Sequence, residues 1–142
     1  MTNIGFYKLD GDQNSAFKLV CQLIKKALKA QKQVLCLVPN KYSAELLDNM
    51  LWGFEPSEFI PHGCGADQYP VAIISDPVPM DHHQILINLQ PQIPSWFSRF
   101  ERVLEIIYTQ PEYEQAKRDN FRFYKERGYP LSFYDLTKQI SK

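Results

Sequence analysis

The stretch Gln33-Val34-Leu35-Cys36-Leu37-Val38 decides the fold class, because an unbroken apolar run follows its single polar residue. A strand with one face in water alternates apolar and polar residues, whereas a continuous apolar run is typical of a strand covered on both faces. Parallel sheets with helices on either side bury their strands in this way. The stretch therefore predicts a central strand of an α/β domain.

Strand and helix patterns alternate along the rest of the chain. Apolar runs predict further strands at residues 3–9, 71–75, 84–89 and 100–108. Helical spacing of apolar side chains predicts three helices: the first is capped by Asn14 or Ser15, the second is capped by Asn40, and the last begins at Pro111. This alternation predicts one α/β domain over residues 1–142, with three layers and a mostly parallel central sheet flanked by helices.

The helix ends are less regular. The first helix is expected to run to about Gln31, and the last to close at Gly128, since Pro130 forbids its continuation. The remaining tail, residues 131–136, is expected to dock as a short helical piece.

The first strand-to-helix turn tests the chain for nucleotide binding. Residues 9–15 contain neither G-x-x-x-x-G-K-[ST] nor G-x-G-x-x-G, the two patterns whose backbone amides hold phosphate. Asp10 and Asp12 in this turn would repel a phosphate group. The sequence predicts a nucleotide-binding-like topology without its phosphate-binding loop, and hence no cofactor.

Other catalytic patterns are missing from the sequence. It has no Gly-x-Ser-x-Gly elbow and no paired cysteine spacing for zinc. His82 and His83 follow Asp81, but adjacent residues of a strand point to opposite faces, so we expect solvated or capping histidines and no metal site. We expect no catalytic activity.

Composition limits the cellular location of the protein and the kinds of partner that it can attract. The chain carries 16 basic and 16 acidic residues, so no bulk charge attracts it to nucleic acid or membrane. No apolar stretch is long enough to span a bilayer, and the N-terminus lacks a secretory signal. Three widely spaced cysteines predict reduced thiols. These features favour a cytoplasmic protein.

The apolar run from Leu51 to His62 follows the second predicted helix. Pro56 and Pro61 make it a poor helix or central strand, so we expect it to be loop-like. Its rings either fold back onto the core or form an exposed docking surface for a partner.

A second candidate surface lies on the last helix. Arg118, Phe121, Arg122 and Lys125 recur at a spacing that places them on one helical face. Two arginines beside a ring suit a peptide that carries a carboxylate and an apolar side chain. A solvated charged face with Phe121 half in the core fits the same spacing, as does a surface for single-stranded nucleic acid.

Short motifs in order along nearly the whole chain resemble the chi subunit family of bacterial DNA polymerase III. They are Phe6-Tyr7, Leu51-Trp52, Phe59-Ile60-Pro61-His62, Ile85-Leu86-Ile87-Asn88-Leu89 and the ending Ala116-Lys117-Arg118…Phe121-Arg122…Tyr124-Lys125…Gly128-Tyr129. The resemblance implies a non-catalytic accessory subunit of the clamp loader in DNA replication. Direct binding of single-stranded nucleic acid is the alternative.

The resemblance also implies partners and a location. Family members bind the psi subunit one to one, which tethers them to the clamp loader, and the acidic C-terminal tail of single-stranded-DNA-binding protein. A repair helicase is a further candidate partner, and contact with DNA is expected to be indirect only. The expected location is the cytoplasm of a bacterium, at the replication fork.

Site residues follow from the resemblance by position. Trp52 and Phe59 match aromatics of the psi-binding surface. The tail-binding pocket matches Ile107, Arg118, Phe121 and Arg122. A family member has tyrosine and lysine in place of the last two, so ring and charge are preserved while the hydroxyl is lost.

Overall fold

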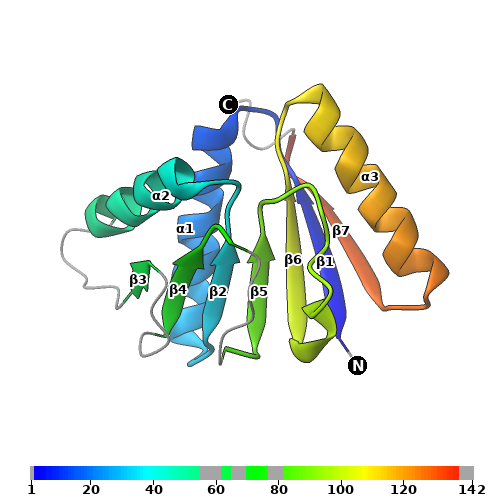
Figure 1. Cartoon of the computed structure of the whole chain (residues 1–142), viewed down its shortest axis with the longest axis horizontal. Helices are drawn as coiled ribbons and strands as arrows, with labels where there is room; N and C mark the ends of the chain where they lie inside the picture. Colours follow the sequence, from blue (N-terminus) through cyan, green and yellow to red (C-terminus); the bar gives the residue numbers. More distant parts are fainter. Residues whose placement is uncertain (1, 55–61, 65–69, 77–81, 138–142) are drawn as a thin grey trace.

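The computed structural model describes residues 2–54, 62–64, 70–76 and 82–137. They form one sheet of seven strands in the order β3-β4-β2-β5-β6-β1-β7 (Figure 1). Every neighbouring pair runs parallel. The strands are β1 (Asn3–Lys8), β2 (Val34–Leu37), β3 (His62–Cys64), β4 (Val71–Ile74), β5 (Ile85–Asn88), β6 (Arg102–Ile107) and β7 (Leu131–Asp135).

Helices cover both faces of the sheet, which confirms the predicted three-layer α/β domain. Helices α1 (Gln13–Lys29) and α2 (Lys41–Phe54) pack on one face, and α3 (Pro111–Glu126) packs on the other with the short 3-10 helix η1 (Phe97–Arg99) (Figure 1). Strands that alternate their side chains between two covered faces must be apolar throughout. In β2, Val34 and Cys36 enter one core, and Leu35 and Leu37 enter the other.

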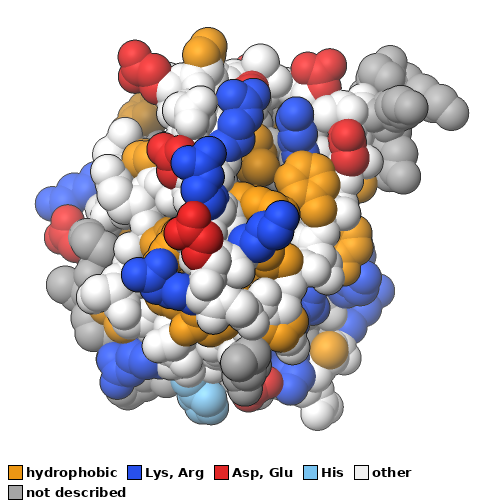
Figure 2. All heavy atoms as spheres, turned by 90° about the vertical axis from the view of Figure 1, so that its right-hand side faces the viewer, with side chains coloured by type: hydrophobic (Ala, Val, Ile, Leu, Met, Phe, Trp, Pro, Cys, Tyr) orange, Lys and Arg blue, Asp and Glu red, His pale blue; other side chains and the backbone are white. Residues whose placement is uncertain are grey.

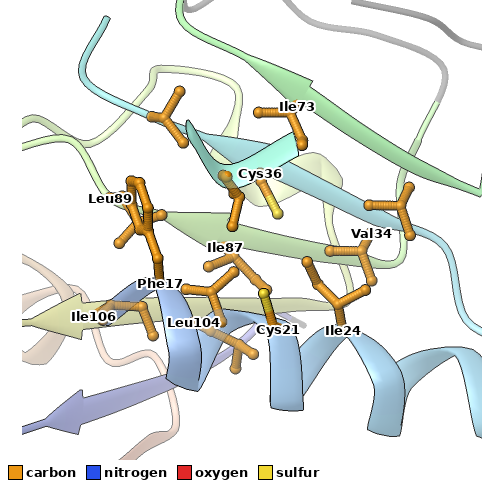
Figure 3. Close-up of a cluster of buried hydrophobic side chains, with 14 of the residues drawn as sticks. Phe17, Cys21, Ile24, Val34, Cys36, Ile73, Ile87, Leu89, Leu104 and Ile106 are labelled. Atoms are coloured by element: carbon orange, nitrogen blue, oxygen red, sulfur yellow. The ribbon is translucent and has the colours of Figure 1, made fainter. Parts of the chain in front are cut away.

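The two cores differ in composition. The α1/α2 core is almost wholly aliphatic, and Figure 3 shows Phe17, Cys21 and Ile24 of α1 facing Val34 and Cys36 of β2. The α3 core contains buried rings at Phe6, Phe97, Phe100 and Tyr124. We therefore distinguish an aliphatic face under α1 and α2 from an aromatic face under α3.

Capping side chains fix the helix starts. α1 begins at Gln13 because Asp12 Oδ1 accepts the Ser15 N–H at 3.1 Å, so the predicted caps Asn14 and Ser15 are wrong by two or three residues. Asn40 caps α2 as predicted, since its Oδ1 accepts the Ser43 N–H at 2.8 Å.

The end of the chain departs from the prediction. Gly128 closes α3 in a left-handed conformation (φ 78°), as expected. Residues 131–135, however, form strand β7 along β1 and not a helical piece. The free edge of β1 accepts this strand because Ile4 donates its N–H to Pro130 O at 2.9 Å and Leu136 donates to Lys8 O at 2.7 Å. A helical pattern of short range could not reveal this long-range pairing.

The prediction that the apolar run from Leu51 to His62 is loop-like is wrong at both ends of the run. Residues 51–54 continue α2, with Leu51 buried in the aliphatic core, and His62–Cys64 form strand β3. Phe59 and the rest of residues 55–61 lie outside the described residues. Of the histidines predicted to be solvated or capping, His82 is 3% exposed and so is not solvated, whereas His83 is exposed.

Candidate functional site

The carboxyl ends of β1 and β6 lie where folds of this topology bind nucleotides. Here the two loops bond to each other: Gly11 donates its N–H to Thr109 Oγ1 at 3.1 Å, and Thr109 returns its N–H to Gly11 O at 2.7 Å. Asp12 occupies the start of α1 with a carboxylate. The backbone amides of Gly11 and Thr109 are thus already hydrogen-bonded within the chain. The negative charge of Asp12 beside them would repel a phosphate.

A pocket of about 220 Å³ lies beside α3 and is lined by residues of α3 and of the strands β1, β6 and β7. Figure 2 faces this side of the molecule and shows hydrophobic side chains gathered between Lys and Arg side chains. The residues around the pocket are Phe6, Lys8, Ile107, Glu114, Lys117, Arg118, Phe121 and Phe133.

Three phenylalanine rings form the apolar wall of this pocket. Phe6 is fully buried, and its ring meets that of Phe121 edge-on at 5.2 Å between centroids. Phe133 lies 6.1 Å from Phe121 and is 49% exposed. The rings come from β1, α3 and β7 and support one another, so the wall is preformed.

A charged rim surrounds the rings. The Arg118 side chain is 64% exposed, and its guanidinium lies 3.9 Å from Glu114 Oε2, one helical turn earlier. This contact is long and solvated, so it holds the arginine weakly. Lys8 adds a second cation from the sheet. Arg118 can therefore release the Glu114 carboxylate and bind the carboxylate of a ligand in its place.

A buried ion pair anchors α3 beneath the pocket. Lys117 Nζ donates to Glu105 Oε1 at 2.6 Å, Gln90 O at 2.7 Å and Asn88 O at 3.1 Å, and both charged side chains are fully buried. These acceptors match the three protons of an ammonium group. Burial lowers the pKa of Lys117, and the attraction of Glu105 opposes that shift.

The second oxygen of Glu105 is equally well satisfied. Tyr124 donates its hydroxyl to Glu105 Oε2 at 2.7 Å, and Asn88 Nδ2 donates to the same carboxylate. Burial and the Glu105 charge both raise the pKa of Tyr124. Because every partner is hydrogen-bonded, the network locks α3 onto β5 and β6 in one position.

The structure brings together three of the four residues predicted for the tail-binding pocket. Ile107, Arg118 and Phe121 all line it. Arg122 is exposed on the next turn of the helix but does not line the pocket. The half-burial of Phe121 agrees with part of the alternative interpretation, a charged face with a ring half in the core.

Sequence reasoning missed Phe6, Lys8 and Phe133. A buried ring in a predicted strand carries no sign that it borders a pocket. Phe133 belongs to the tail that was predicted to be helical, so its placement beside Phe121 needed the pairing of β7 with β1.

The residues predicted for the second surface lie elsewhere. Trp52 is in α2, whose backbone packs near β3 and β4 at the opposite edge of the sheet from β7 (Figure 1). The Trp52 side chain and all of Phe59 lie outside the described residues, so the pairing of these two aromatics stays a prediction.

Two further properties concern the described part of the chain. No helix in it combines the length and the apolar character of a membrane-spanning segment. No group of three or more His, Cys, Asp or Glu side chains within residues 2–51, 70–76 and 82–137 is arranged to hold a metal ion.

Comparison with known proteins identifies the family. The family model of the DNA polymerase III chi subunit (HolC) matches residues 1–132. DNA polymerase III subunit chi of Pseudomonas aeruginosa is 35% identical over 141 residues, which cover 97% of this chain and 99% of that protein. The chain belongs to the DNA polymerase III chi subunit family. It is thereby assigned to DNA replication.

More distant members of the chi family are also similar. The Haemophilus influenzae protein is 26% identical over 81% of this chain and 83% of its own length, and the Escherichia coli protein is 25% identical over 93% and 97%. Among solved structures, T4 UvsW superposes with a TM-score of 0.68 at 7% identity, over 96% of this chain and 42% of that one. At this identity the likeness concerns the fold alone.

Proposed function

We propose that this chi-family chain is a non-catalytic accessory subunit that joins the clamp loader to the acidic C-terminal tail of single-stranded-DNA-binding protein. The observation that supports this function is the pocket beside α3, where an apolar wall of rings meets an exposed arginine. Such a site suits a peptide that ends in an apolar side chain and a carboxylate.

The tail would bind in two parts. Ile107 and Phe121 enclose its last apolar side chain, and Arg118 pairs with its terminal carboxylate in place of Glu114. Arg122, one turn further along, pairs with acidic side chains that precede the end. Because these charges are exposed, affinity is modest and falls as salt is added. Many tails on coated DNA then supply avidity.

The psi subunit would bind at the other edge of the sheet. Trp52 in α2 and Phe59 are the aromatics proposed for that contact, in a one-to-one complex that reaches the clamp loader through psi. The position of α2 at the edge opposite β7 supports two separate surfaces. These two partners would place the protein at the replication fork in the cytoplasm.

A peptide titration tests the tail site. The probe is a synthetic peptide with a run of aspartates, a C-terminal phenylalanine and a free carboxylate. Arg118→Glu should abolish its binding, because the replaced cation now repels the peptide, while Lys18→Glu on α1 should leave affinity unchanged. Isothermal calorimetry measures both variants. Wild-type affinity in Arg118→Glu would overturn the proposal.

Two additional measurements separate the rival functions. Trp52→Ala should weaken binding of psi and leave the peptide affinity intact, so joint loss would contradict two separate surfaces. Naked single-stranded DNA should not bind. Strong retention of that DNA with a steep salt dependence would instead support direct nucleic-acid binding.

A further inference from the structure

The outer strand β7 combines two properties beside the pocket. It lies at the end of the sheet, and within the described residues it pairs with β1 alone. Its five residues are mostly exposed, and they carry two of the three exposed large hydrophobic side chains in the described chain: Phe133 at 49% and Tyr134 at 42%. Protein edge strands are normally short, charged or covered, because their backbone groups can pair with another chain.

The ladder with β1 determines which backbone groups point outward. Pro130 O and the Leu136 N–H bond to β1. Residues that face a given neighbour alternate along a parallel strand. Ser132 and Tyr134 therefore pair with β1, and Leu131, Phe133 and Asp135 turn their N–H and C=O groups away from the sheet.

Phe133 connects this edge to the pocket. Its side chain forms part of the apolar wall next to Phe6 and Phe121, while its backbone lies at the centre of the outward-facing edge. The rim around that wall carries two cations, Lys8 and Arg118, against one carboxylate, Glu114. Figure 2 shows this side of the molecule, with basic side chains and some acidic ones around the apolar surface. At Phe133, an extended acidic peptide would thus meet both the charge-complementary pocket and the strand edge.

We propose that the acidic peptide binds by strand addition: the residues before its apolar end pair with the outer edge of β7, and that end enters the pocket. This inference rests on the proposed tail-binding function and assigns its binding mode. Backbone pairing supplies affinity that does not depend on the peptide's side chains, and the pocket selects its end. Phe133 is the residue shared by both contacts.

Amide hydrogen exchange tests strand addition residue by residue. The full chain is labelled with ¹⁵N, and exchange is followed by NMR with and without saturating aspartate-rich peptide. The Leu131 and Phe133 amides should slow by at least about tenfold, while those of Ser132 and Tyr134, already paired with β1, change little. A peptide that binds without slowing Leu131 and Phe133 overturns strand addition and leaves the tail-binding function standing. No peptide binding at all overturns the function itself.

A matched pair of variants provides a second measurement. Leu131 is the first residue of β7 and its N–H points outward, so Leu131→Pro removes that donor without breaking the ladder to β1. Leu131→Ala truncates the same side chain and keeps the donor. Peptide affinity should be about three- to tenfold weaker in the proline variant than in the alanine variant. Equal affinities would overturn the proposal, provided that both variants keep slow β1 amides.

A second copy of the chain is the competing occupant of the edge. If β7 pairs with another β7, protection of Phe133 should grow with protein concentration in the absence of peptide. Sedimentation equilibrium would then show a dimer, and this outcome would overturn the assignment to the peptide.

Discussion

The two faces of the sheet use opposite means to hold their helices. The aliphatic face buries thiols and branched side chains under α1 and α2, with Phe17 as its one fully buried aromatic ring among the described residues. The aromatic face holds α3 through rings and through the ion pair of Lys117 with Glu105. Packing on the first face is non-directional, whereas the second fixes one orientation of α3.

This difference teaches why the pocket lies where it does. A helix held only by aliphatic contacts can shift when its neighbours are substituted, but Lys117 must reach three particular oxygens. Arg118 and Phe121 follow Lys117 on the same helix, and their aim into the pocket depends on that anchor. The face with the buried charges is therefore the face that presents a binding site.

Removing the anchor should give the largest effect. Lys117→Met leaves the Glu105 carboxylate buried without its cation and should lower the free energy of unfolding by about 3–5 kcal/mol. Ile24→Val on the aliphatic face should cost only about 0.5–1.5 kcal/mol. Urea unfolding measures both. Similar losses in the two variants would contradict the proposed difference between the faces. In the double variant, adding Glu105→Gln to Lys117→Met should recover much of the lost stability.

Alkaline pH should act on the aliphatic face through its thiols. Burial raises the pKa of Cys21 to about 12, whereas an unfolded thiol ionises near pH 9. Between these values the unfolded chain has lost a proton that the folded chain keeps, so stability falls as pH rises. The loss is about 1.4 kcal/mol per pH unit for this group.

Comparison with Cys21→Ala isolates this contribution. The variant should be less stable at pH 8, but its stability should fall less steeply between pH 9 and 11, because groups such as Tyr124 titrate in both proteins. Urea unfolding across this range gives the two slopes. Parallel slopes would mean that Cys21 is not responsible.

The smallest effect concerns the rim of the pocket. Glu114→Gln removes the carboxylate that competes for Arg118, so affinity for the acidic peptide should rise by about 1.5- to 5-fold. Glu112→Gln makes the same change in the same first turn of α3, at an exposed residue that does not line the pocket. Calorimetry should detect the gain only at Glu114. Equal gains in both variants would indicate a general charge effect and not a local exchange.

Much of the fold could be predicted because it is encoded locally. The apolar run at 33–38 contains β2, Asn40 caps α2, and Gly128 closes α3. Of the site, the spacing of Arg118 and Phe121 on one helical face was visible, and the family resemblance added Ile107. The partners of Lys117 were not visible, because a lysine and a glutamate 12 positions apart look like surface residues until the fold joins them.

The amino-acid sequence by itself determined the α/β class, the missing phosphate-binding loop and the helix that carries Arg118, since all of these follow from patterns within a few turns or strands. Only the tertiary structure decided that residues 131–135 form an edge strand and that Phe133 joins Phe6 and Phe121 at a pocket. The physical reason is that strand pairing is a contact between distant segments. Its hydrogen bonds run between backbones, and the identity of the side chains only weakly specifies them.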